Sequence, residues 1–97
     1  MHARRVHHRG RFSQFAVAAA KLVLADIDEA RDRHAEGERH LEEAVALYKG
    51  LGAKAELGET YMRLSRSAGK RGDTSDAQKY ADLAYATTKK TSGLVER

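Results

Sequence analysis

The chain of 97 residues contains no cysteine, no proline and no tryptophan. Without cysteine, neither a disulfide nor a thiolate zinc site can stabilise the fold, and the ordinary expectation is a reducing, cytoplasmic setting. Without proline, nothing forces a helix to break, and the abundant Ala, Leu, Glu, Lys and Arg are typical of an all-α protein. The longest apolar run, residues 15–25, is shorter than the roughly 20 residues that span a bilayer, so we expect no membrane association.

Acidic residues are missing from the first eleven positions, which hold four arginines and three histidines. We expect residues 1–12 to form a basic, flexible, solvated arm. An alternative function is binding of nucleic acid, in which the arm would neutralise phosphates through Arg4, Arg5, Arg9 and Arg11. The sequence shows no aromatic residues interleaved with these arginines and no recognition-helix signature.

A basic start followed by an apolar run is also how a secretory signal peptide begins. Here Lys21 interrupts the run, and apolar residues continue beyond it at helical spacing. We therefore interpret residues 15–25 as part of an amphipathic helix.

Apolar spacing predicts four antiparallel helices, over residues 13–33, 35–49, 54–69 and 76–90. Ser13 is the expected N-cap of the first helix, and Asp73, Thr74 or Ser75 that of the fourth. The glycines within residues 50–52 are expected to end the second helix, because glycine readily adopts the left-handed conformation.

The second and fourth helices carry similar residues at an offset of 40 positions. Ala44 recurs as Ala84, and in the first and third helices Leu24 recurs as Leu64. Amphipathic helices share a period of 3.6 residues, but they need not share small residues in register. The pattern therefore indicates an internal repeat of a helical hairpin, which is typical of helical solenoids.

Residues 58–91 resemble the tetratricopeptide repeat, in its long variant of bacterial regulatory and signalling proteins. The matching residues are Tyr61, Leu64, Ser65, Gly72, Asp73, Ala77 and Ala84. Ala68, Ala81 and Lys89 depart from the motif, and residues 18–57 are a poorer copy. The resemblance implies an all-α fold of two helical hairpins in a short right-handed solenoid. The repeats would span about 13–52 and 53–92, followed by a polar tail at 93–97.

The resemblance implies a non-enzymatic protein–protein interaction module, as in the C-terminal part of a bacterial regulatory protein. The first helix of each repeat in such proteins lines a groove that holds peptides. The groove residues implied here are Glu59, Met62, Arg63, Arg66 and Lys70. Three cations on one helix face would favour an acidic segment or a free C-terminus. The alternative is a solvated basic face whose cations have salt partners.

The first helix is apolar on almost every side, and arrays of this kind usually need three repeats or more. We expect this helix to be covered, either in a homodimer or by a preceding repeat of a longer solenoid. The residues expected to mediate self-association are Phe15, Val17, Leu22, Val23 and Leu24.

No pattern indicates catalysis, a cofactor or a metal. Residues 69–72 lack the spacing of a phosphate-binding loop, and His34 and His40 lie on different sides of a helix. Carboxylates such as Asp28 have a basic residue nearby, here Arg31, as on solvated helices. We therefore expect no enzymatic activity.

Overall fold

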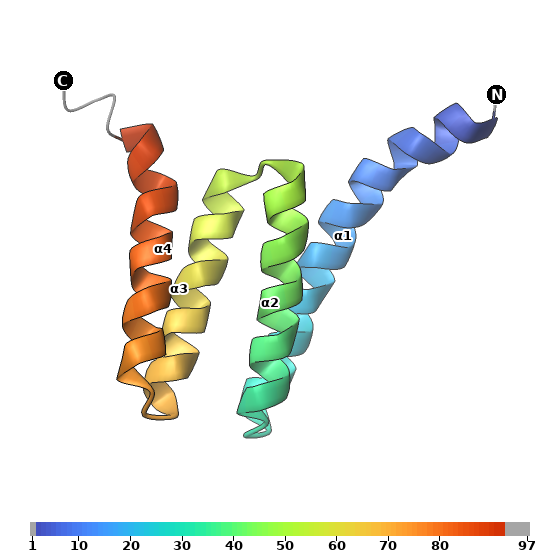
Figure 1. The fold of residues 1–97 in the computed structure, drawn as a ribbon. Helices are drawn as coiled ribbons and strands as arrows, with labels where there is room; N and C mark the ends of the chain where they lie inside the picture. Colours follow the sequence, from blue (N-terminus) through green and yellow to red (C-terminus); the bar gives the residue numbers. More distant parts are fainter. Residues whose placement is uncertain (1, 93–97) are drawn as a thin grey trace.

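The computed structural model describes residues 2–92, with the side chains of residues 10–89. Its regular structure over this range is entirely helical, which confirms the all-α prediction. Consecutive helices run antiparallel and are joined by short turns (Figure 1). They are α1 (His2–Ala30), α2 (His34–Leu51), α3 (Lys54–Lys70) and α4 (Thr74–Ser92).

The start of the first helix differs from the prediction. Because α1 begins at His2, Ser13 is an interior helical residue and not an N-cap, and the segment predicted as a flexible arm is helical from His2 onwards. Gly10 alone costs a helix about 1 kcal/mol, which is too little to end it. The other helix boundaries lie within about three residues of their predicted positions. The predicted tail at 93–97 lies outside the described residues.

The three turns share one backbone conformation at intervals of twenty residues. Asp32, Gly52 and Gly72 have φ values of 60°, 70° and 84°. In each turn, the next residue donates its N–H to the carbonyl five positions earlier, at 2.8, 3.0 and 2.9 Å. This is the Schellman arrangement that ends helices. Gly50 is helical, so Gly52 alone terminates α2.

Replacing Asp32 by glycine should stabilise the protein by about 0.5–1 kcal/mol, because a side chain in the left-handed region is strained. The Asp32 carboxylate lies 3.9 Å from His34 Nε2 and is 93% exposed, so its loss costs little. Denaturant unfolding measures the change. Gly72→Asp is the matched control and should destabilise by a similar amount; a neutral or destabilising Asp32→Gly would contradict this account.

Both hairpins have a close approach at equivalent positions. In the first, a Cβ built on Gly37 would lie 3.4 Å from the Ala25 carbonyl oxygen. In the second hairpin, Ser65 and Ala77 occupy the positions forty residues after Ala25 and Gly37. There the Ser65 hydroxyl donates a hydrogen bond to the Ala77 carbonyl at 2.7 Å. Small residues at these positions let the helices of each hairpin approach closely, so the sequence repeat is also a structural one.

Gly58 marks a second close approach, between α3 and α4. A Cβ added there would lie 2.8 Å from Thr88 Cγ2, which is too close. Gly58→Ala should therefore destabilise the protein in thermal unfolding. In a Thr88→Ser background, which removes only the methyl group, the same change should stabilise by up to about 1 kcal/mol through helix propensity. Destabilisation of equal size in both backgrounds would exclude this contact as the cause.

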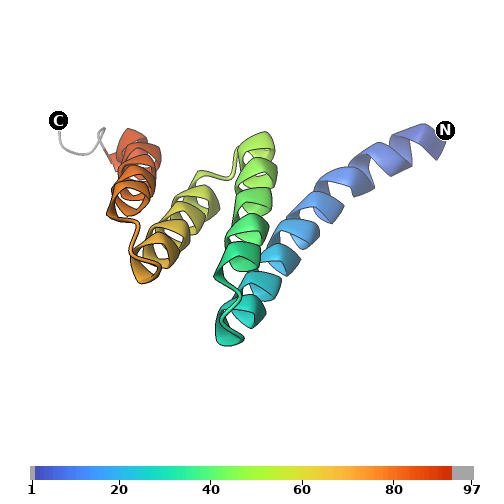
Figure 2. The same cartoon turned by 60° about the horizontal axis from the view of Figure 1, so that its bottom comes forward.

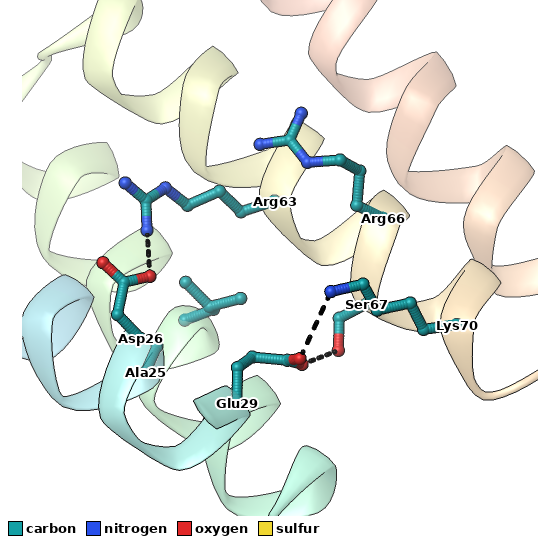
Figure 3. A pocket seen from close by; sticks show the side chains of 8 residues that line it. Ala25, Asp26, Glu29, Arg63, Arg66, Ser67 and Lys70 are labelled. Carbon is teal, nitrogen blue, oxygen red and sulfur yellow. Dashed lines mark hydrogen bonds and ion pairs between the residues drawn. The ribbon is translucent and has the colours of Figure 1, made fainter. Parts of the chain in front are cut away.

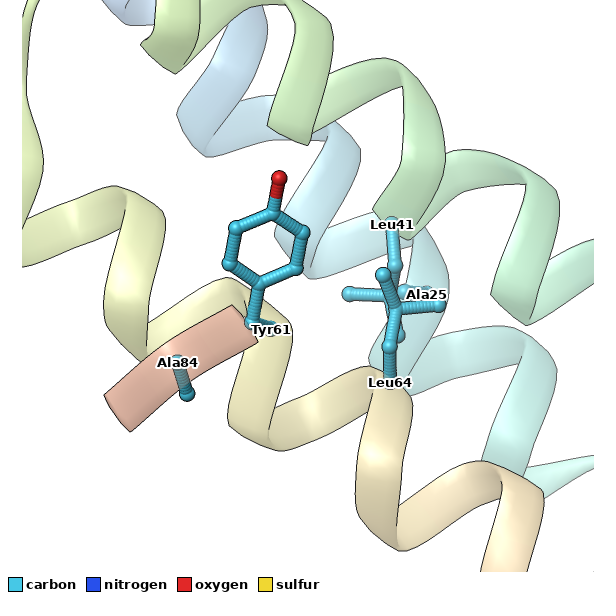
Figure 4. Packing of buried hydrophobic residues seen from close by; sticks show 5 residues of the cluster. All are labelled: Ala25, Leu41, Tyr61, Leu64 and Ala84. Carbon is cyan, nitrogen blue, oxygen red and sulfur yellow. The ribbon is translucent and has the colours of Figure 1, made fainter. Parts of the chain in front are cut away.

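The helices pack as a row: α1 on α2, α2 on α3 and α3 on α4 (Figure 2). One buried cluster takes residues from all four helices (Figure 4). Its members are Ala25, Leu41, Tyr61, Leu64 and Ala84. A second lies between α1 and α2, with Leu51 closing it at the end of α2. The slab is only 15 Å across its thinnest direction, so both faces of the row remain accessible.

Candidate interaction surfaces

A groove of about 320 Å³ lies between α1 and α3 (Figure 3). The predicted cations Arg63, Arg66 and Lys70 all line it, together with Ala25, Asp26, Glu29, Leu41 and Ser67. The other two predicted groove residues, Glu59 and Met62, are exposed on α3 and do not line this groove.

Two of the three cations have partners on α1. Arg63 Nη1 donates to Asp26 Oδ1 at 2.9 Å, and Lys70 Nζ lies 3.6 Å from Glu29 Oε1. Arg66 is exposed and has no hydrogen-bond or ion-pair partner among the described residues, and Figure 3 shows no such interaction between it and the other residues drawn. The groove therefore holds one uncompensated positive charge, at Arg66.

Glu29 connects three helices at one end of the groove. Its Oε2 accepts hydrogen bonds from His34 Nδ1 at 3.0 Å and from the Ser67 hydroxyl at 3.1 Å. The hydrogen bond from His34 lowers the pKa of the Glu29 carboxyl, with help from Ser67 and the charges of His34 and Lys70, against the opposing effect of burial. The lowered pKa keeps the Glu29 carboxylate ionised. Its hydrogen bonds join α1 to α2 and α3 at this end of the groove.

Arg71 ties α2 to the second hairpin. Its guanidinium donates to both carboxylate oxygens of Glu38, at 2.7 and 3.0 Å, and also to Asp73 and Asp76. These hydrogen bonds, chiefly the one to Glu38, raise the pKa of Arg71. Asp73 accepts the Asp76 backbone N–H at 2.9 Å and so caps α4, as predicted. That bond, and then Arg71, lower the pKa of the Asp73 carboxyl.

Asp28 has a partner that the sequence did not predict. The expected ion pair with Arg31 is wrong, because Asp28 is only 8% exposed and its Oδ2 lies 2.8 Å from His40 Nδ1 on α2. Asp28 comes three residues after the buried Ala25, on the side of α1 that faces α2. Its burial therefore follows from helical periodicity, whereas the His40 contact depends on how the two helices pack.

The second candidate surface is the face of α1 turned away from α2. We call it the outer face and define it by Val17, Ala20, Val23, Leu24 and Ile27. Its large side chains are 41–57% exposed. The sequence predicted Val17, Val23 and Leu24 but not Ile27, which continues the same helical spacing. Such a strip of apolar side chains along one helix is typical of an interface.

The remaining residues predicted for self-association are placed differently. Leu22 is half-buried and packs against both core clusters, so its assignment to the free surface is wrong. The Phe15 ring lies 6.4 Å from that of Tyr48 on α2 and is 38% exposed. Phe12, which was not predicted, is 79% exposed. The in-chain contacts of Leu22 and Phe15 point towards α2, away from the outer face.

Three of the five α3 residues at positions equivalent to the outer face are buried, and the other two are half-buried. Forty residues after Val17, Ala20, Val23, Leu24 and Ile27 come Leu57, Thr60, Arg63, Leu64 and Ser67. Thr60, Leu64 and Ser67 are 1%, 0% and 4% exposed, and this side of α3 packs on α2. The outer face of α1 thus corresponds to a face that the second repeat buries against its preceding helix.

The basic residues proposed for nucleic-acid binding lie where α1 projects beyond α2 (Figures 1 and 2). Arg11 is exposed, whereas the side chains of Arg4, Arg5 and Arg9 lie outside the described residues. Among the side chains that are described, no group of three His, Asp or Glu residues could hold a metal ion. No described helix combines the length and the apolar character needed to cross a membrane.

No family model, curated protein or solved structure matches this chain.

Proposed function

We propose that the chain is a non-enzymatic protein-interaction module that assembles through the outer face of α1. The observation that carries this proposal is the repeat equivalence: three of the five positions exposed on the outer face of α1 are positions that α3 buries on the side facing α2. A helix that packed on the outer face of α1, as α2 packs on α3, would bury these exposed side chains. Each large side chain of the face would gain about 1 kcal/mol on losing its remaining exposure.

The tetratricopeptide-like character of the module, and its place in a bacterial regulatory protein, are part of the same proposal. The turns spaced by twenty residues and the equivalent close approaches in both hairpins support a repeat of this type. Close backbone contacts between successive helices alone are likewise what such a repeat requires.

The groove supports a second candidate function, binding of an acidic peptide segment at Arg66. The unpaired guanidinium there is free to hold a carboxylate with two parallel hydrogen bonds. A fluorescently labelled acidic peptide tests this by anisotropy. Arg66→Gln should abolish binding, while Arg39→Gln, at an exposed cation on α2, should leave it unchanged. Equal affinity of the two variants would exclude this function.

Ile27→Glu tests assembly through the outer face. A carboxylate within a buried apolar contact is costly, so the variant should sediment as a monomer where the unmodified protein sediments as a larger species. Leu83→Glu on α4 is the matched control, because Leu83 is similarly exposed at 38%. The proposal fails if Ile27→Glu leaves the sedimentation coefficient unchanged.

A further inference from the structure

Resting on the proposed function, we propose that the outer face of α1 binds the same face of a second copy, with the two helices antiparallel. The product is a closed, two-fold symmetric dimer. Four features carry this inference: the direction of the helices, the order of small and large residues along the face, the distribution of charge, and the polar character of the opposite end of the row.

Helix direction follows from the repeat. The equivalent face of α3 is covered by α2, which runs antiparallel to it (Figure 1). A second α1 related by a two-fold axis across the helices is also antiparallel. Such an interface uses the same surface on both copies and therefore closes at two subunits.

Residue size is graded along the outer face. The first half carries the smaller residues Val17 and Ala20, while the second half carries Val23, Leu24 and Ile27. Antiparallel packing places Ala20 opposite Leu24 of the second copy, and Val17 opposite Ile27. Smaller side chains then meet larger ones, as close packing requires. Parallel packing would instead set alanine against alanine and leave gaps at one end.

The distribution of charge along the chain also favours antiparallel pairing. Residues 2–11 carry four arginines and no acid, whereas residues 26–38 carry six carboxylates and two arginines. In this register Gln14 lies level with Ala30, the last residue of the other α1, so Arg11 comes close to the turn that holds the exposed Asp32 of the other copy. Parallel pairing would bring like charges together. Dimer formation should therefore weaken as salt is added.

Head-to-tail stacking of α4 on α1 is the competing arrangement. On α4, the exposed Leu83 and Tyr85 are interspersed with exposed Gln78, Lys79 and Asp82. That surface offers no continuous apolar strip to match the outer face. Stacking of this kind would also leave both ends open and produce chains of increasing length.

The antiparallel register predicts which pairs of introduced cysteines will form a disulfide between the two copies. Because the protein has no native cysteine, no other disulfide can form. Val17→Cys and Ile27→Cys proteins, one carrying a tag, are mixed and oxidised. The mixture should form a disulfide-linked heterodimer. Each variant alone should not, because its two cysteines would lie about 15 Å apart along the helix axis, too far for a disulfide. Both sites are exposed, so the variants should fold.

Ala20→Cys mixed with Leu24→Cys provides a second pair at the centre of the contact. Cross-linking of each variant with itself, at Val17 and at Ile27, would overturn the antiparallel register but leave assembly through the outer face intact. Absence of cross-links in both mixtures would also overturn the register. If Ile27→Glu in addition left the sedimentation coefficient unchanged, the proposed function would fall with it.

Discussion

Leu64→Ala should lower the free energy of unfolding by about 3 kcal/mol. Leu64 is fully buried where residues of all four helices meet, beside Ala25, Leu41 and Tyr61. Its truncation leaves a cavity that the flanking alanines are too small to fill. In a domain of this size, the midpoint of thermal unfolding should fall by about 10–20 °C.

Leu83→Ala is the matched control for this prediction. The same chemical change at a side chain that is 38% exposed should cost much less, because less apolar surface is removed from the interior. A loss below about 1 kcal/mol for Leu64→Ala would mean that the four helices do not share this contact.

His40→Ala should cost about 1–3 kcal/mol, because it leaves the Asp28 carboxylate buried without its partner. The double variant Asp28→Ala/His40→Ala should recover part of this loss, since removing both partners leaves no unpaired group. Urea unfolding of the single and double variants measures the coupling.

Arg31→Ala distinguishes the observed pair from the one that the sequence predicted. Arg31 is exposed, and its removal should change stability by less than about 0.5 kcal/mol. If Arg31→Ala cost more than His40→Ala, the Asp28–His40 contact would not be the interaction that holds α1 on α2.

Most of the fold could be predicted because its signals are local. Helical periodicity and the turn residues located α2, α3 and α4 to within about two residues. Asp73 was among the three predicted caps, since an acidic residue before a helix readily accepts a backbone N–H. The start of α1 was predicted wrongly because Ser13 is the first residue of the N-capping type in the chain. The helix in fact begins at His2, where the sequence has no recognisable N-cap.

The interaction surfaces were predicted less completely, because they depend on how helices pack. Spacing placed Arg63, Arg66 and Lys70 on one face of α3, but whether each has a partner depends on the opposing residues of α1. Leu22 was indistinguishable from Leu24 in a helix that is apolar all round. Only the direction of α2 shows that Leu22 points inward.

The most direct test of assembly through the outer face is the mass of the unmodified protein by light scattering over a concentration series. The account predicts a species of about twice the 10.7 kDa chain mass, dissociating on dilution and in high salt. A compact species of the chain mass that persists at the highest concentration would contradict it.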